Sequence, residues 1–219
     1  AGMLRRGWKA KQISTRYEAL QHVHIYGDAS LEGQTDDQRK DSEKYIGGVV
    51  VVNNKPAKAF KIKIDYIPEW ALVHLAIGLL EAIAAHMCQI FFAAERLGKF
   101  TIQHVDNSAD CYILTKCFAK CPATHAVANQ LAVDGIGDVY YAWICTKRNE
   151  LGDSCTRMVK LEQLQKIHPE LEFLSMSESD IPWDGYRQQY LNLTNFLPNN
   201  VHNRGDREFV NNSVVERCG

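Results

Sequence analysis

Three segments near the start of the chain have the pattern of β-strands and follow one another closely along the sequence. In the third, apolar residues alternate with lysines, so one face is apolar and the other charged. A turn separates the second segment from the third, and a polar loop, Leu31–Lys44, separates the first from the second. Strands joined in this way form an antiparallel meander, so we expect strands at His22–Asp28, Tyr45–Val52 and Ala57–Ile64.

After the meander the chain alternates between helical and strand patterns. Pro68 suits the first turn of a helix that we expect to run to about Leu97. Further expected elements are a strand at Lys99–Val105, helices at Asn107–Lys120 and Ala123–Val133, a strand at Val139–Cys145, a helix at Leu151–Ile167 and a short helix at Tyr186–Phe196. This order predicts an α/β fold with a mixed five-stranded sheet and helices packed on it.

The pattern divides the 219-residue chain into three parts. Residues 1–20 form a basic arm, which is either a frayed terminus or a contact for phosphates. Residues 21–168 form the folded domain, and residues 169–219 an extension or linker with weak patterning. The balance of 46% hydrophobic and 23% charged residues is typical of a globular protein.

Charge and cysteine content restrict the partners and the compartment. The net charge of −1 excludes an overall attraction to nucleic acid, so any such contact must come from local basic patches. The seven scattered cysteines indicate free thiols in a reducing, intracellular compartment. Cys117, Cys121 and His125 lack a fourth zinc ligand nearby. The apolar stretch around Ala71–Ala94 contains polar residues and predicts a core helix, so no membrane is expected as a partner.

Two acids directly follow apolar strands. Asp28 comes after Val23–Gly27, and Asp106 comes after Ile102–Val105. Ligand sites gather at the carboxyl ends of strands in open sheets. These positions make both aspartates candidates for a functional site.

Glu81 has small or apolar neighbours three and four positions away on its helix, so its carboxylate should point toward packed surface. An ionised, unpaired carboxylate there would cost several kcal/mol, so a cation must compensate it. That cation is a metal ion, or an arginine or lysine; otherwise Glu81 is partly exposed. Asp153 lies at the start of the last predicted helix, where it serves either a site or the helix dipole.

Taken together, four short motifs resemble the ribonuclease H domains associated with reverse transcriptases. The motifs are Asp28-Ala29-Ser30, Leu80-Glu81-Ala82-Ile83-Ala84, Val105-Asp106-Asn107-Ser108 and Asn149-x-x-x-Asp153-x-x-x-Arg157. The last two look closest to tyrosine-recombinase retroelements of the DIRS group and to hepadnaviral polymerases. The resemblance covers about residues 22–166. Two departures are Gly152, where relatives have alanine, and the absence of a histidine between Trp143 and Asp153.

The resemblance implies a ribonuclease H-like catalytic domain that uses two Mg²⁺ or Mn²⁺ ions to cut the RNA strand of an RNA–DNA hybrid. It assigns Asp28 to both ions, Glu81 and Asp106 to one, and Asp153 to the other. Oxygen-only ligands fit these hard cations. Asn107 is a candidate contact for the 2′-OH or a helix cap. Candidate phosphate contacts are Lys116, Lys120, Lys147 and Arg148. Arg157 either pairs with an active-site acid or contacts phosphate.

The expected partners are the hybrid and a reverse transcriptase domain in the same polyprotein. Two other classes of function remain open. One is another two-metal nuclease of this fold, such as a transposase or integrase core, although these usually use three acids at different spacing. The other is a non-enzyme: an inactive ribonuclease H-like module that binds nucleic acid or protein, or a structural component of an assembly.

Overall fold

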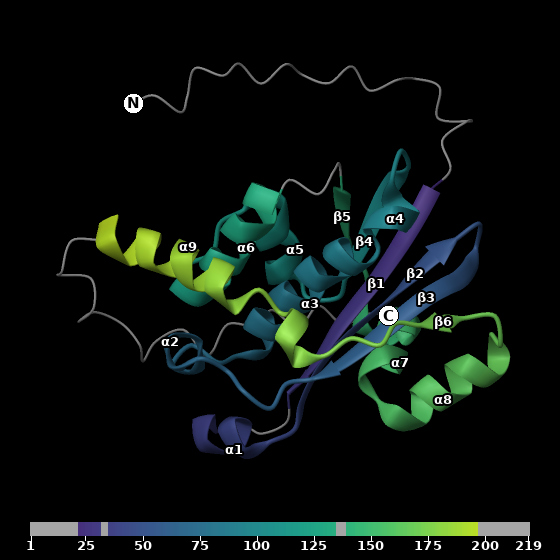
Figure 1. The fold of residues 1–219 in the computed structure, drawn as a ribbon, viewed down its shortest axis with the longest axis horizontal. Helices are drawn as coiled ribbons and strands as arrows, with labels where there is room; N and C mark the ends of the chain where they lie inside the picture. Colours follow the sequence, from purple (N-terminus) through teal and green to yellow (C-terminus); the bar gives the residue numbers. More distant parts are fainter. Residues whose placement is uncertain (1–21, 32–34, 135–138, 197–219) are drawn as a thin grey trace.

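The computed structural model describes residues 22–31, 35–134 and 139–196, which form one mixed sheet with helices on both faces (Figure 1). The strands are β1 (His22–Leu31), β2 (Lys44–Val52), β3 (Lys55–Lys63), β4 (Phe100–Val105), β5 (Val139–Trp143) and β6 (Glu172–Phe173). The helices are α1 (Asp36–Asp41), α2 (Glu69–Leu72), α3 (Ile77–Phe91), α4 (Ala93–Arg96), α5 (Ser108–Lys116), α6 (Pro122–Asp134), α7 (Glu150–Thr156), α8 (Met158–Ile167) and α9 (Trp183–Phe196). Two 3-10 turns, Thr146–Arg148 and Glu178–Asp180, complete the description.

The sheet has the strand order β5-β4-β1-β2-β3-β6. β1, β2 and β3 form the antiparallel meander, while β4 pairs in parallel with β1 and β5 in parallel with β4. This arrangement confirms the predicted fold class. The prediction of five strands omitted β6, which pairs with Lys58 and Ala59 of β3 over only two residues. So short a strand has no periodicity of its own and exists only because the chain returns to this edge.

Two predicted helices are divided in the structure. The segment expected as one helix from Pro68 to Leu97 forms α2, α3 and α4, and Ala76 before α3 is extended. The rings of Trp70 and His74 lie against Tyr190 of α9, a tertiary contact that no local pattern reveals. The last helix is broken at Arg157, which is extended between α7 and α8. The loop at Leu31–Lys44 contains α1, whose amino end has a capping box formed by Thr35 and Gln38.

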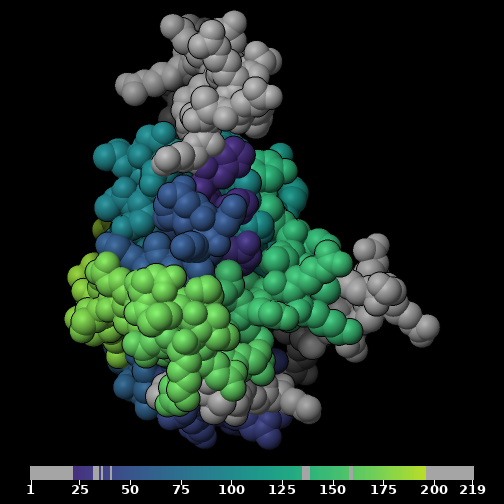
Figure 2. Space-filling view, turned by 90° about the vertical axis from the view of Figure 1, so that its right-hand side faces the viewer, coloured from purple at the N-terminus to yellow at the C-terminus, as the bar shows by residue number. Residues whose placement is uncertain are grey.

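The main core lies between the sheet and α3. From Leu79 to Gln89, every residue of α3 except Glu81 is buried. On the opposite face, Cys155 of α7 and Leu164 of α8 pack against Val49 and Ala59 of the sheet. Figure 2 shows α8 and the chain that follows it covering a continuous area of this side of the molecule.

Two consecutive glycines let both layers approach β2 closely. A Cβ at Gly47 would lie 2.8 Å from the backbone oxygen of Cys155 in α7. A Cβ at Gly48 would lie 2.3 Å from Sγ of Cys88 in α3. Neighbouring residues of a strand face opposite sides of the sheet, so this pair sets the distance of α7 on one side and of α3 on the other.

Ile181 and Tyr186, from the chain that follows β6, pack onto the main core. Tyr186 of α9 is fully buried, and its hydroxyl lies 2.8 Å from Nδ1 of His86 in α3. Nε2 of the same histidine lies 2.8 Å from a carboxylate oxygen of Asp134 in α6. Three helices therefore meet at one buried imidazole. The domain boundary after residue 168 stays a prediction, and the basic arm and residues 197–219 lie outside the described residues.

The described cysteines are free thiols. Within the described ranges, no helix is long and apolar enough to cross a membrane.

The glycine pair generates a prediction about folding stability. Gly48→Ala should destabilise the domain by about 1–3 kcal/mol, because the new methyl group meets Sγ of Cys88. Adding Cys88→Ala removes that sulfur, so the double variant should be more stable than the sum of the single effects predicts. Urea unfolding of the four proteins measures this coupling.

A matched pair tests the geometry on the other face. Gly47→Ala should not be rescued by Cys155→Ala, because its methyl group also meets the backbone carbonyl of residue 155. If the changes in unfolding free energy for Gly48→Ala and Cys88→Ala simply add in the double variant, the close approach of α3 to β2 is contradicted.

Candidate active site

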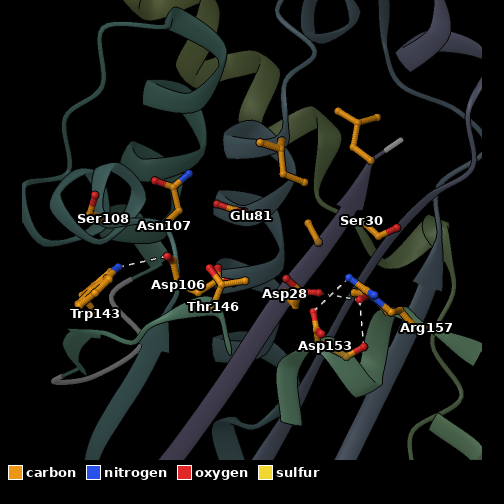
Figure 3. A pocket seen from close by; sticks show the side chains of 14 residues that line it. Asp28, Ser30, Glu81, Asp106, Asn107, Ser108, Trp143, Thr146, Asp153 and Arg157 are labelled. Atoms are coloured by element: carbon orange, nitrogen blue, oxygen red, sulfur yellow. Dashed lines mark hydrogen bonds and ion pairs between the residues drawn. The ribbon is translucent and has the colours of Figure 1, made fainter. Parts of the chain in front are cut away.

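The four acids singled out in the sequence line one open cleft of about 730 Å³ (Figure 3). Asp28 lies in β1, Asp106 directly follows β4, Glu81 projects from α3 and Asp153 from α7. Asp28 was expected at the end of its strand, but β1 continues to Leu31 because β2 pairs with it to the end. The parallel pairing of β1 with β4, however, stops at Tyr26 and His104. Asp28 therefore lies just beyond the end of that pairing, as expected. The carboxyl ends of β1 and β4 thus bring Asp28 and Asp106 to one edge.

Asp28 is the most buried of the four acids, with 8% of its surface exposed. The hydroxyl of Thr156 donates a hydrogen bond of 2.6 Å to its Oδ2. Burial raises the pKa of Asp28 to about 7; the Thr156 hydrogen bond opposes the rise, and the neighbouring acids add to it. With a pKa of about 7, this carboxyl group is partly protonated at neutral pH, so a cation that bound there would release a proton.

Glu81 shares its surroundings with a fifth acid, Asp110 of α5. Asp110 is 2% exposed, and its carboxyl group lies against Gly78 of α3, where a Cβ would be 3.2 Å from Oδ1. One oxygen of each acid, Oε2 of Glu81 and Oδ2 of Asp110, is buried without a hydrogen-bond partner. Burial raises the pKa of both carboxyl groups, so the pair favours holding a proton over carrying two charges.

Asp106 is surrounded by groups that hold its segment in place. The indole Nε1 of Trp143 donates to its backbone oxygen at 3.2 Å. Burial raises the pKa of Asp106, and hydrogen bonding from the Asn149 side chain opposes that rise. Oδ1 of Asn107 accepts hydrogen bonds from the backbone N–H groups of Ala109 and Asp110, at 2.9 and 3.4 Å. Asn107 therefore caps α5, and it also lines the cleft.

Gly152 makes room for the buried amide of Asn149. A Cβ at Gly152 would lie 2.6 Å from Oδ1 and 2.7 Å from Nδ2 of Asn149. The same Nδ2 donates to the backbone oxygen of Gly27 at 3.3 Å, next to Asp28. The glycine that departs from the family pattern thus allows Asn149 to join α7 to β1 behind the acids.

Asp153 contacts two cationic side chains of its own chain. Nζ of Lys160 lies 2.6 Å from Oδ2, and a guanidinium nitrogen of Arg157 lies 3.8 Å from Oδ1. Arg157 lines the cleft and is 65% exposed. Lys147 and Arg148 are exposed on the 3-10 turn before α7 and do not line the cleft, and neither do Lys116 and Lys120.

The chemistry of the donor set fits a divalent metal ion, because the four acids supply only carboxylate oxygens and one oxygen of Glu81 is unpartnered. Their present spacing does not form a finished site. Among the described residues, no three His, Cys, Asp or Glu side chains are placed to hold one ion. Oxygens of Asp28 and Asp153 are instead engaged by Thr156 and Lys160.

Asp110, Asn149, Thr156 and Lys160 were not singled out as site residues in the sequence, although Asn149 opens one of the motifs. Asp110 follows Asp106 by one helical turn, a spacing that hinted at its place. The contact of Lys160 depends on the break at Arg157, for which the sequence has no proline or glycine signal, whereas the contact of Thr156 joins α7 to Asp28 of β1, far away in the chain.

Comparison with known proteins finds similarity only among solved structures: no family model and no curated protein matches the sequence. The chain is similar to ribonuclease H1 from Halobacterium salinarum NRC-1, with 16% identity and a TM-score of 0.48 over 65% of this chain and 98% of that one. The N-terminal ribonuclease H domain of a Mycobacterium tuberculosis protein matches with 16% identity and a TM-score of 0.47 over 67% and 98% of the two chains. LC11-RNase H1 in complex with an RNA/DNA hybrid matches with 12% identity and a TM-score of 0.44 over 61% and 92%. Roles for individual residues rest on the site itself.

The raised pKa of Asp28 predicts a pH-dependent stability difference between the wild type and Asp28→Asn. The stabilising contribution of the Asp28 proton is complete below its ordinary pKa of 3.8 and is lost as the pH rises through about 7. The amide keeps an acceptor for Thr156 and never ionises. The variant should therefore gain stability relative to the wild type between pH 5 and pH 8, by at most an amount on the order of 3 kcal/mol.

Thermal melts of both metal-free proteins across this range measure the difference. The difference is the informative quantity, because burial lowers the pKa of His86 and His104 and gives both proteins an opposite pH slope. A difference that does not change with pH would show that Asp28 is ionised in the folded protein throughout.

Proposed function

We propose that this chain is a metal-dependent endonuclease that hydrolyses the RNA strand of RNA–DNA hybrids during reverse transcription of a retroelement. The observation that carries the proposal is the convergence of Asp28, Glu81, Asp106 and Asp153 in one open cleft, with burial raising the pKa of three of them. Acidic side chains with shifted pKa values that line a cleft are typical of a functional site.

Two Mg²⁺ or Mn²⁺ ions, when bound, supply an activated water and stabilise the leaving oxygen. Following the family resemblance, Asp28 is assigned to both ions, Glu81 and Asp106 to one and Asp153 to the other. The chain contributes the fixed placement of these carboxylates: β1 and β4 are strands of one sheet, and Asn149 ties α7 to β1. Binding a metal ion still requires side-chain rearrangement, because Thr156 and Lys160 engage oxygens of Asp28 and Asp153 in the structure.

The two sides of the cleft differ, and this difference suggests how the hybrid is oriented. Figure 3 shows Asn107, Ser108 and Trp143 on one side and Arg157 on the other, with the acids between them. Because Oδ1 of Asn107 is occupied by the cap, its Nδ2 group is the part that could donate to a 2′-OH. Arg157 is proposed to contact phosphate, and Lys147 and Arg148 to contact the backbone beyond the cleft.

The proposed place of the chain is beside a reverse transcriptase domain in the same polyprotein, which would supply the hybrid. An inactive module that binds nucleic acid is the second candidate. It is favoured by one observation: within the described residues, no three acids are placed to hold an ion.

Hydrolysis separates the two candidates. The wild-type protein should cut the RNA strand of a labelled hybrid in Mg²⁺ or Mn²⁺, leave duplex DNA intact and stop in excess EDTA. Cleavage that survives EDTA, or equal cutting of both strands, would contradict the proposal. Binding of the hybrid without any cutting would favour the inactive module.

Asp106→Asn should reduce cutting to background while hybrid binding persists or tightens. The change removes a metal ligand, and it also relieves repulsion between neighbouring carboxylates. The metal-free variant should melt at the same temperature as the wild type or higher, and Mg²⁺ should raise its melting temperature less. Asp65→Asn is the matched control, because Asp65 is an exposed acid outside the cleft.

An Asp106→Asn protein that folds and still cuts at the wild-type rate would place the chemistry elsewhere. An unfolded variant would assign Asp106 to the fold alone.

A further inference from the structure

Lys160 occupies one oxygen of Asp153 in the structure. Its Nζ lies 2.6 Å from Oδ2, while Arg157 faces Oδ1 at 3.8 Å. A magnesium ion binds a carboxylate oxygen at about 2.0–2.1 Å. An ammonium group in hydrogen-bond contact with Oδ2 takes up much of the space around that oxygen, so the two cations compete for it.

The break between α7 and α8 is what permits this contact. Asp153 and Lys160 are seven residues apart, which in one continuous helix separates them by about 10.5 Å along the axis. In the structure α7 ends at Thr156, Arg157 is extended and α8 starts at Met158. The backbone therefore turns at the point that brings Lys160 back toward the cleft.

The ion pair between Lys160 and Asp153 is weak enough for a divalent ion to displace the lysine. The side chain of Lys160 is 41% exposed and that of Asp153 is 19% exposed. Ion pairs this accessible to water contribute about 0–1 kcal/mol. A divalent ion carries twice the charge and binds several acids at once, so it can displace the ammonium group from Asp153. The displaced lysine stays tethered three residues after Arg157, which lines the cleft.

We propose that Lys160 is a positioning residue with two successive partners: Asp153 in the metal-free protein, and a backbone phosphate of the bound nucleic acid once Asp153 binds a divalent ion. This inference rests on the proposed function. Lys160 keeps Asp153 oriented while the cleft is empty, and it adds a positive charge beside the substrate strand when the cleft is filled. The alternative is an ordinary surface ion pair with no effect on either ligand.

The first test is Mg²⁺ binding by the metal-free protein, measured by titration calorimetry without nucleic acid. Lys160→Met removes the competing cation, so Mg²⁺ should bind tighter by up to about fivefold. Lys166→Met is the matched control, since Lys166 is an exposed lysine in the same helix, and the lysine that pairs with Asp153 is Lys160. It makes the same change in net charge and should leave Mg²⁺ affinity unaltered.

The second test measures hybrid binding against salt concentration in a Glu81→Gln background, which should stop hydrolysis and leaves Asp153 intact. With Mg²⁺ present, Lys160→Met should weaken binding and reduce the slope of log affinity against log salt by about one. In EDTA, where Lys160 is paired with Asp153, the same change should have little effect. Lys160→Arg should retain binding and slope.

Unchanged Mg²⁺ affinity in Lys160→Met would overturn the proposal, and so would a slope that falls equally in Mg²⁺ and in EDTA. Failure of the proposed function has a different signature. In that case the wild type itself would bind no Mg²⁺ or leave the hybrid uncut, and the inference about Lys160 would fall with it.

Discussion

The cost of burying several carboxylates in one cleft, to which their mutual repulsion adds, is the constraint around which this site is organised. Four acids line the cleft, a fifth lies behind Glu81, and burial disfavours their charged forms. The protein relieves this repulsion in three ways. Thr156 donates to Asp28, Lys160 pairs with Asp153, and Glu81 and Asp110 favour sharing a proton. In each case a divalent cation could take the place of the group that now stabilises the carboxylate: a hydroxyl, an ammonium group or a shared proton.

The scaffold explains why the acids cannot move apart. β1 and β4 are hydrogen-bonded neighbours, so Asp28 and Asp106 lie at the same edge. α3 and α7 approach β2 from opposite faces through Gly48 and Gly47, and these helices carry Glu81 and Asp153. The unfavourable free energy of crowding these charges is offset by burial of the apolar core between α3 and the sheet. In α3, every residue from Leu79 to Gln89 except Glu81 is buried. A site that is unfavourable when empty is therefore held by packing that does not depend on any ligand.

Much of the fold could be predicted because its signals are local. The meander, the strands β4 and β5 and the helices α5 and α6 follow from periodicity and turn residues that lie within each segment. The breaks at Ala76 and Arg157 could not be predicted, because the helical pattern continues across both and Gly78, inside α3, is the one glycine within two residues of either. At the first break, Trp70 and His74 lie against Tyr190 far along the chain, a contact that no local pattern reveals. For the same reason β6 was missed: its two residues become a strand only through pairing with β3.

For the site, the sequence by itself determined that Asp28 lies on a strand, that Asp106 directly follows one and that Glu81 lies on the buried helix, because residue type and periodicity suffice to place them on their elements. It also determined that the four candidate ligands offer only carboxylate oxygens, and hence which kind of metal ion they would suit. Only the tertiary structure decided what each carboxyl group touches. The partnership of Asp110 with Glu81, the hydroxyl of Thr156 on Asp28 and the reach of Lys160 to Asp153 all join segments whose separation is set by packing. Electrostatic interactions depend on distance and burial, and neither quantity is encoded in the local pattern of a chain.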